Sequence, residues 1–256
     1  MHPRSTPAGA SALWVNAVGR RCRSVLADTL ARIATKNHAN GIHNPYAHLR
    51  KDFGFDFCNT VSEKNPLVAG PLRRTDCSLV SDGAAAVVVI SPERAARAAR
   101  AIAWRGRGQS NDHLALSRRA DVLELAGARR AWRQAADQAG IDDITELDLL
   151  ETHDCFTIAE LLEYEAFGLA DAGKGASVIE SGRSAIDGEL PVNPSGGLKS
   201  KGHPIGATGV SQHVMAALQL TGEAGDMQVP GARRAGVFNM GGVAVANYFS
   251  VLERVQ

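Results

Sequence analysis

Apolar residues recur with the period of an α-helix in several parts of the chain. Residues 25–36 show this period at Val25, Leu30 and Ile33, and the polar segment NHANGIHNPYAHLRK that follows contains Gly and Pro, which predict a long loop. Three later segments have the same helical pattern and are separated by loops. These predicted helices cover residues 122–139, 157–170 and 206–220.

Short apolar or alternating runs predict β-strands between these helices. The clearest ones are AIAWRGRGQS, ELDLLETH, RAGVFNMG and AVANYFSVLER. Residues 75–91, which end in GAAAVVVIS, predict a buried strand or a tightly packed helix leading into one, and residues 92–101 predict a helix or a charged connector. Strands that alternate with helices of this length indicate a layered α/β fold built on a sheet.

Composition and charge narrow the class of protein. With 45% hydrophobic and 21% charged residues, the 256-residue chain resembles an ordinary globular protein that is large enough to form a core. Its formal net charge of +1 provides no overall field that would favour nucleic acid or an anionic membrane. No segment approaches the roughly 20 apolar residues that a membrane-spanning helix needs. We therefore expect no nucleic-acid partner and no integral membrane segment.

Cysteine spacing and the start of the chain bear on its compartment. Cys22, Cys58, Cys77 and Cys155 are scattered without CxxC spacing, and the sequence does not open with a secretory signal. This pattern favours reduced thiols and a cytoplasmic location. Residues 1–24 show neither helical nor alternating periodicity and mix Pro, Gly, Arg and Ser, so we expect a poorly ordered leader there.

The segment NPSGGLKSKGHPIGATG, residues 193–209, holds five glycines and two prolines, which together fix an unusual loop path. This path places His203 just before the predicted helix that begins at residue 206. A helix N-terminus favours a neutral imidazole and bound anions, so His203 suits a proton acceptor or a hydrogen-bond donor to a developing oxyanion. The alternative is a surface turn in which this histidine has no role.

Two nucleotide-binding motifs do not fit the glycine-rich loops. A P-loop requires Lys and then Ser or Thr after its second glycine, whereas His and Pro follow Gly202 here. A dinucleotide-binding fingerprint would require a glycine at Asn111 after Gly106 and Gly108. The sequence therefore gives no support for nucleotide binding at either loop.

His153, Asp154 and Cys155 stand between a predicted strand and a predicted helix, at the end of a strand where ligands tend to bind in open α/β sheets. A thiol beside a histidine and a helix N-terminus can have a lowered pKa and exchange a proton near neutral pH. In the alternative interpretation, Cys155 is a small buried apolar residue and Asp154 caps the helix. A zinc site formed by His153, Cys155 and His203 would lack a fourth ligand and the usual paired spacing.

Three segments, HDCFTIAELL, NPSGGLKSKGHPIGATG and FNMGGVAVANYFSVLER, occur in the order found in thiolases. On these motifs the chain resembles the thiolase family, and within it the branch of sterol-carrier-protein-type, or lipid-transfer, thiolases. The resemblance implies a layered α/β/α/β/α fold of two similar βαβαβαββ halves, usually dimeric. It also implies acyl-CoA C-acyltransferase chemistry, the reversible Claisen condensation or thiolytic cleavage of 3-oxoacyl-CoA, with coenzyme A as co-substrate and no permanently bound cofactor or metal.

The same resemblance implies roles for individual residues. His203 matches the histidine of the family's GHP motif, which activates the nucleophilic cysteine and helps to line an oxyanion hole, and Gly202 of that motif is expected to contact the substrate. His153 stands where most thiolases have the asparagine of an NEAF motif, which holds a water in the same hole. Ser78 matches a serine that contacts the pantetheine of coenzyme A.

The acid/base thiol is expected at a different place from that in most thiolases. Most members carry it in a C-terminal CxG motif, where this chain has Asn239, Met240 and Gly241. Gly241 keeps the glycine whose backbone N–H resembles the second oxyanion-hole donor. In the sterol-carrier-type branch the HDCF motif carries the thiol, which implies that Cys155 is the acid/base residue.

The resemblance covers the C-terminal portion of a thiolase. It divides the chain into an unrelated leader over residues 1–24, the end of the N-terminal half with its loop region over residues 25–91, and a complete C-terminal half over residues 92–256. We therefore expect a βαβαβαββ unit that carries the tail of the other half.

None of Cys22, Cys58 and Cys77 stands in the context of the family's nucleophilic cysteine, which we expect in a segment that this chain lacks. Three explanations remain open: a truncated thiolase with little activity, a subunit of a split thiolase, or a non-catalytic acyl-CoA-binding module. A thiolase-like aldolase is a further alternative. The expected partners are acyl-CoA substrates and either a second copy of the chain or the missing N-terminal half.

Overall fold

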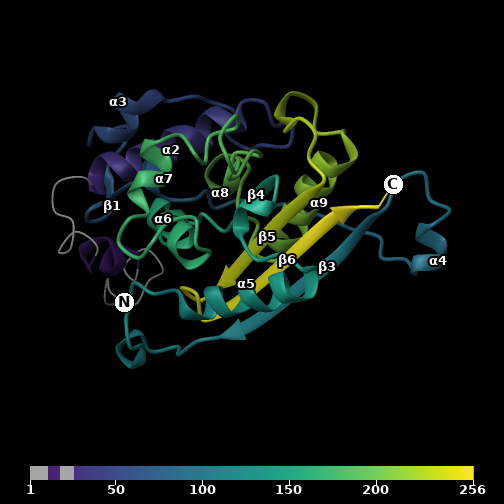
Figure 1. The fold of residues 1–256 in the computed structure, drawn as a ribbon. Helices are drawn as coiled ribbons and strands as arrows, with labels where there is room; N and C mark the ends of the chain where they lie inside the picture. Colours follow the sequence, from purple (N-terminus) through teal and green to yellow (C-terminus); the bar gives the residue numbers. More distant parts are fainter. Residues whose placement is uncertain (1–10, 18–25, 256) are drawn as a thin grey trace.

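The fold is built on a four-stranded mixed sheet (Figure 1), seen in a computed structural model that describes residues 11–17 and 26–255. The strand order is β3-β6-β5-β4, in which β4 and β5 run parallel and the other neighbours are antiparallel. A parallel bridge between Leu150 and Val192 adds one further pairing beside β4. The strands are β3 (Ile102–Asn111), β4 (Leu149–Glu151), β5 (Arg234–Gly241) and β6 (Ala246–Arg254).

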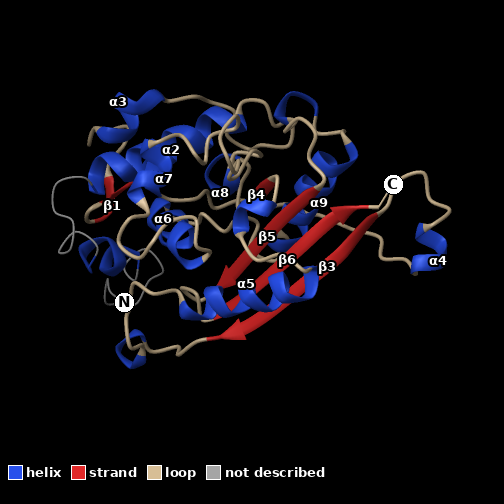
Figure 2. Ribbon diagram, viewed as in Figure 1, coloured by secondary structure: helices blue, strands red, loops and turns tan. Residues whose placement is uncertain are grey.

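Helices cover both faces of this sheet and form a further layer beside it. α5 packs on β3 and β6, where it crosses in front of the sheet in Figure 2, whereas α9 packs on β4 and β5 from the opposite face. α2 contacts α6, α7 and α8 at the other side of the molecule. The helices are α2 (Leu26–Gly41), α3 (Gly54–Asn59), α4 (Pro92–Ala95), α5 (Ala126–Ala139), α6 (Thr157–Ala166), α7 (Ala176–Glu180), α8 (Gly197–Ser200) and α9 (Thr208–Thr221).

Shorter elements connect these units. A two-stranded antiparallel ribbon follows α3, and single 3-10 turns lie between the longer helices and strands. They are β1 (Leu67–Ala69), β2 (Leu72–Arg73), η2 (Arg74–Asp76), η3 (Leu116–Arg118), η4 (Ile144–Glu146) and η5 (Gly225–Met227).

Alternate residues of β5 belong to two different cores. Phe238 packs with Phe249 and Trp132 on the α5 face, where the rings of Trp132 and Phe249 have centroids 4.9 Å apart. Val237 faces the other way and packs with Leu220 of α9. Because successive side chains of a strand point to opposite faces, burial on both sides accounts for the nearly continuous apolar sequence of β5.

Gly106 and Gly108 of β3 let α5 approach the sheet closely. A Cβ atom at either position would lie 1.9 Å from a backbone carbonyl oxygen of α5. The side chains of Gln134 and Gln138 then reach the outer edge of β3, where they accept hydrogen bonds of 3.0 and 3.3 Å from two backbone N–H groups. These glycines therefore allow the close packing of α5 on β3. This role accounts for them without a dinucleotide-binding motif.

The predicted α/β architecture is confirmed, with changes at the ends of several elements. The helix expected over residues 25–36 continues to Gly41, because the polar residues Asn37 and His38 are buried in it and the Asn37 amide finds partners. The helix expected from residue 122 begins at Ala126, and the long loop before residue 200 contains the short helices α7 and α8.

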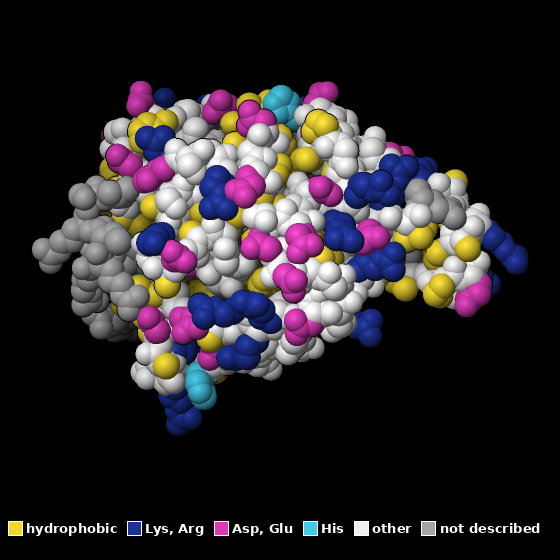
Figure 3. Space-filling model, in the orientation of Figure 1, with side chains coloured by type: hydrophobic (Ala, Val, Ile, Leu, Met, Phe, Trp, Pro, Cys, Tyr) yellow, Lys and Arg dark blue, Asp and Glu magenta, His cyan; other side chains and the backbone are white. Residues whose placement is uncertain are grey.

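Residues 75–91 do not form the buried strand that their sequence predicts. Val80, Val88 and Val89 are exposed by 105%, 89% and 72%, and no strand in the described part of the chain pairs with residues 79–91. The following helix, α4, covers four residues, and this part projects from the body in Figure 1, with apolar side chains on its surface in Figure 3. A strand needs a neighbour for its backbone hydrogen bonds, so an apolar run alone is not sufficient.

Part of the expected leader is folded. Residues 11–17 form a helix, and Trp14 and Val15 are 1% and 2% exposed within the main core. The prediction of a poorly ordered leader is therefore wrong for this segment, and its other residues lie outside the described ones. None of the helices that the structure describes is long and apolar enough to cross a membrane.

Candidate active site

His153 lies where β4 ends, beside the neighbouring strand β5. Its side chain is 6% exposed, and its Nδ1 atom lies 2.7 Å from Oδ1 of Asn239 on β5. Because β4 and β5 are adjacent and parallel, their carboxyl ends meet at one edge of the sheet. The sequence placed His153 at a strand end, but it did not identify Asn239 as its partner.

His203 lies in the loop between α8 and α9 and faces His153. The two imidazole rings are 5.0 Å apart between centroids and meet edge to face at 87°. The backbone N–H of His203 donates to Oγ of Ser81 at 2.7 Å, which fixes the loop. Residues 50 positions apart in the sequence thus form one pair of rings.

The contacts of His203 determine which ring nitrogen carries its proton. Nδ1 lies 2.8 Å from Oγ1 of Thr208, and the Thr208 hydroxyl donates its own proton to the Pro204 carbonyl at 3.0 Å. The hydroxyl oxygen therefore accepts from Nδ1–H, which leaves a lone pair on Nε2 of a neutral ring. His203 has the tautomer that a general base at Nε2 requires.

Burial keeps both imidazoles neutral. It lowers the pKa of His153 to about 3, and it also lowers the pKa of His203, in each case as the largest cause. The Lys201 ammonium contributes in the same direction to both. Lys201 is 5% exposed, and its Nζ atom donates to Oγ of Ser211 at 2.8 Å.

Cys155 is a neutral thiol, not a thiolate. Burial raises its pKa, and the nearby Glu163 carboxyl raises it further, which outweighs the attraction of the Lys199 ammonium. The sequence led us to expect that a neighbouring histidine and a helix N-terminus could lower the pKa of Cys155. That prediction is wrong for this structure, in which the pKa is raised. A half-buried neutral thiol is suited to donating a proton to a basic atom.

Asp154 joins the 153–155 turn to the loop that carries His203. Its carboxyl accepts hydrogen bonds from the backbone N–H of Leu198 at 2.6 Å and from the amide of Asn37 at 2.9 Å. A Cβ atom on Gly197 would lie 2.4 Å from Oδ2 of Asp154. Phe156 occupies the N-cap of α6, which has no side-chain cap, so the alternative role of Asp154 as that cap is wrong.

Three further predicted site residues lie close to these elements. The backbone N–H of Ser78 donates to the carbonyl of Cys155 at 2.8 Å, which places the two residues side by side. Gly202 has φ of 112°, and a Cβ atom there would lie 2.9 Å from the His48 ring, so the loop path needs glycine. Gly241 is the exposed last residue of β5, two positions beyond Asn239.

The other described cysteines are poor nucleophiles. Cys58 is fully buried, and burial raises its pKa. Burial also raises the pKa of Cys77 to about 11. Cys22 lies outside the described residues. A reactive thiolate is therefore not provided by the cysteines that the structure describes.

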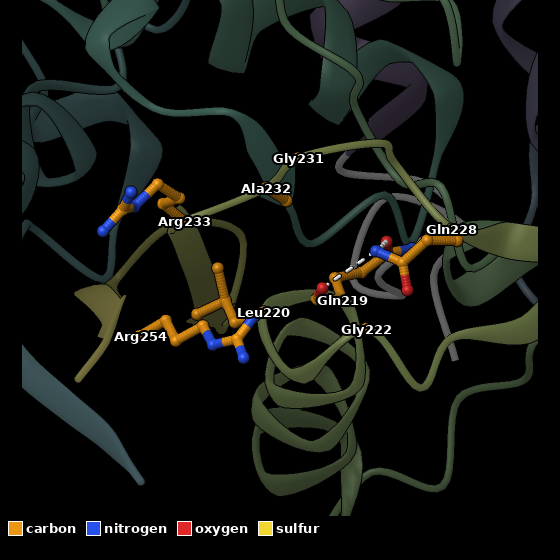
Figure 4. Close-up of a pocket in the computed structure, with 8 residues that line it drawn as sticks. All are labelled: Gln219, Leu220, Gly222, Gln228, Gly231, Ala232, Arg233 and Arg254. Carbon is orange, nitrogen blue, oxygen red and sulfur yellow. Dashed lines mark hydrogen bonds between the residues drawn. The ribbon is translucent and has the colours of Figure 1, made fainter. Parts of the chain in front are cut away.

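The described structure does not support the zinc alternative, and the cavity that it contains lies apart from the candidate site. No group of three His, Cys, Asp or Glu side chains within the described ranges could hold a metal ion. An open cavity of about 410 Å³ lies where the last turn of α9 meets the segments flanking β5 and β6 (Figure 4), and it contains none of the site residues. It is lined by Gln219, Leu220, Gly222, Gln228, Gly231, Ala232, Arg233 and Arg254.

Comparison with known sequences shows the family of the chain. A family model described as "Thiolase C-terminal domain-like" matches residues 108–254. The chain belongs to the thiolase family. It is 38% identical over 218 residues to an acetyl-CoA acetyltransferase of Methanothermobacter thermautotrophicus. That alignment covers 84% of this chain and 55% of the relative. It is 35% identical over 229 residues to sterol carrier protein 2 of Oryctolagus cuniculus, which covers 86% and 41%.

Solved structures agree with the thiolase fold. A chain of the Ltp2-ChsH2(DUF35) aldolase superposes with a TM-score of 0.83 at 19% identity, covering 97% of this chain and 64% of that chain. A monomeric SCP2-thiolase like protein type 1 from Mycobacterium smegmatis superposes with a TM-score of 0.73 at 20% identity, covering 97% and 52%. The thiolase chain described here spans about half the length of the curated relatives that it matches.

Proposed function

We propose that this chain carries the acid/base part of a thiolase site that acts on 3-oxoacyl-CoA. The observation that carries the proposal is a pair of neutral imidazoles, the buried His153 and the half-buried His203, with their rings 5.0 Å apart at the end of the sheet. Each ring has its Nδ1 atom held by a neighbour, so both Nε2 atoms remain for chemistry. Cys155 lies two residues from His153 and supplies a neutral thiol.

The cleavage direction uses these groups in turn. His203 Nε2 accepts the proton of the nucleophilic cysteine, which belongs to the part of a thiolase outside this chain. The thiolate attacks the 3-oxo carbon, and the bond between C2 and C3 breaks with its electron pair moving to C2. The Cys155 thiol gives its proton to C2, which releases acetyl-CoA and leaves the acyl group, shortened by two carbons, on the nucleophilic cysteine.

Coenzyme A completes the reaction as co-substrate. The Cys155 thiolate takes the proton of the incoming coenzyme A thiol, whose sulfur attacks the acyl-cysteine and restores the free nucleophile with its proton. The His203 imidazolium, which has held the cysteine proton since the first step, donates a hydrogen bond to each oxyanion and then returns that proton to the nucleophile. No further oxidant, metal or bound cofactor enters this sequence of steps.

An exposed apolar segment supports the assembly that we propose. Val80, Val88 and Val89 are exposed along an unpaired segment, as expected for a strand that joins a sheet formed by the rest of a thiolase. We propose that the N-terminal half of the fold, either in a longer form of this protein or in a separate subunit, covers this segment and provides the nucleophile. A homodimer and a cytoplasmic location are part of the same proposal.

Asn239 favours a second candidate, a thiolase-like aldolase. A thiolase with the CxG motif has a thiol at this position, whereas this chain has an amide that holds His153. A neutral imidazole base could remove the hydroxyl proton of a 3-hydroxyacyl-CoA, and cleavage of the bond between C2 and C3 would then need no acyl-cysteine. The two reactions differ in their need for coenzyme A.

The test uses the chain joined to the N-terminal portion of the Methanothermobacter acetyl-CoA acetyltransferase that precedes the aligned region. We expect coenzyme A-dependent cleavage of acetoacetyl-CoA by the joined protein and none by the isolated chain. His203→Ala and Cys155→Ala should each lower the rate by about 10² to 10⁴. Cleavage that persists in both variants, or cleavage of a 3-hydroxyacyl-CoA without coenzyme A in place of thiolysis, would contradict the proposed function.

A further inference from the structure

Asn239 has a role that does not follow from its position in the CxG motif. Its side chain projects from β5 to the end of β4, where Oδ1 lies 2.7 Å from Nδ1 of His153. His153 is 6% exposed, so the amide replaces solvent at that ring nitrogen. A buried hydrogen bond of this kind fixes both the orientation and the tautomer of an imidazole.

The surroundings hold the Asn239 amide in place. A Cβ atom on Gly209, in the first turn of α9, would lie 3.0 Å from Nδ2 of Asn239, so the helix backbone packs against the amide. In this arrangement Nδ2 faces Gly209 and Oδ1 faces His153. An amide oxygen only accepts, so Nδ1 of His153 donates and carries the proton of the neutral ring.

We propose that Asn239 is a positioning residue that fixes His153 as the Nδ1–H tautomer, so that Nε2 carries the lone pair of the neutral ring. His153 then accepts a hydrogen bond at Nε2 and does not donate one to an oxyanion directly. The ligand group that suits this atom is a hydroxyl or a water, which can pass its other hydrogen bond to a thioester oxygen. The tautomer stands on the geometry alone, whereas its use in catalysis rests on the proposed function.

The charged and titratable groups around His153 agree with this state. His203 faces it from the loop before α9, and Lys201 lies in the same loop. Both disfavour a second proton on His153, while the hydrogen bond to Asn239 has the opposite effect and is outweighed by burial. The ring therefore remains neutral across the physiological range, and only its tautomer is left for Asn239 to determine.

The test is ¹⁵N NMR of the whole chain labelled at histidine, in which the two ring nitrogens of a neutral imidazole have distinct shifts. His213 provides an internal reference, because its Nδ1 atom lies 2.7 Å from the Gly209 carbonyl oxygen, which can only accept. We expect His153 to match the Nδ1–H pattern of His213, and His153→Gln assigns its signals. In Asn239→Ala, His153 should change to a mixture of tautomers while His203 and His213 keep theirs.

A second variant keeps the side-chain shape. In Asn239→Asp a carboxylate would face Nδ1, and the midpoint of the His153 titration should rise by about one to three pH units. An Nε2–H pattern for His153 in the unmodified chain, or an unchanged His153 signal in both variants, would overturn the inference. Absence of thiolysis by the joined protein, with the predicted tautomer intact, would instead count against the proposed function, so the two failures are distinguishable.

Discussion

The contact between Gly197 and Asp154 connects the segment that carries His203 to the turn that carries His153. One added carbon atom at Gly197 should break this contact. Gly197 has φ of 59°, in the left-handed region, and it packs directly against the carboxyl of Asp154. In Gly197→Ala the new Cβ would lie 2.4 to 2.7 Å from three atoms of that carboxyl group. Either the loop that carries His203 or the turn that carries His153 must move.

The cost of this substitution follows from three effects. A side chain in the left-handed region costs about 1 to 2 kcal/mol. Forcing an extra carbon into a packed site costs roughly 1 to 3 kcal/mol. Displacing the 2.6 Å hydrogen bond from Leu198 N–H to the buried carboxyl costs about 1 to 3 kcal/mol. Since these effects share one relaxation, we expect a loss of roughly 3 to 5 kcal/mol in the free energy of unfolding.

Urea unfolding of the chain, followed by circular dichroism, measures this loss. Gly206→Ala is the control, because Gly206 lies in the loop that carries His203 with nothing within 4 Å of its Cβ position, and it should change the free energy by less than about 0.5 kcal/mol. If the two variants unfold at the same urea concentration, the close contact between Gly197 and Asp154 does not hold the loops together and the reasoning is refuted.

Two further predictions concern the charge near the site and the edge of the sheet. In Lys201→Met, removal of the ammonium should raise the pKa of His203, since that charge now lowers it, and an unchanged NMR titration of His203 would show that Lys201 does not act on the ring. In Gln138→Leu, the backbone N–H of Arg107 loses its side-chain partner at the edge of β3, so the chain should self-associate more at high concentration in light scattering. Asp137→Leu adds similar apolar area elsewhere on α5, and equal association in both variants would exclude the edge as the cause.

The order of strands and helices could be predicted because burial imposes a period on the sequence. β5, β6, α5 and α6 fall within the predicted segments, and α9 exceeds its segment by one residue. The run over residues 83–90 is as apolar as β5, yet it remains without a partner in the described structure. The hydrophobic pattern of a segment indicates its tendency to be buried. Whether the segment pairs as a strand depends instead on other strands that are distant in the sequence.

The site was predictable in its residues but not in its contacts. The motifs point to His153, Cys155 and His203, whereas the bond between His153 and Asn239 spans 86 positions and depends on β4 lying beside β5. The same holds for Asp154, whose partners lie in α2 and α8 and not in the adjacent helix. The neutral state of the Cys155 thiol also depends on burial, which its sequence neighbours do not reveal.

The acid/base role of Cys155 is the central claim, and exchange of the C2 protons of acetyl-CoA in D₂O tests it most directly. The measurement is proton NMR of acetyl-CoA incubated with the joined protein described above, in which transfer of the acetyl group to the nucleophile passes the Cys155 proton to the leaving coenzyme A and so forms the Cys155 thiolate that removes a C2 proton. We predict enzyme-dependent loss of the C2 proton signal, slowed at least about 100-fold in Cys155→Ala and unchanged in Cys58→Ala, whose side chain lies in a separate core beneath α2. Exchange at the unmodified rate in Cys155→Ala would contradict the account.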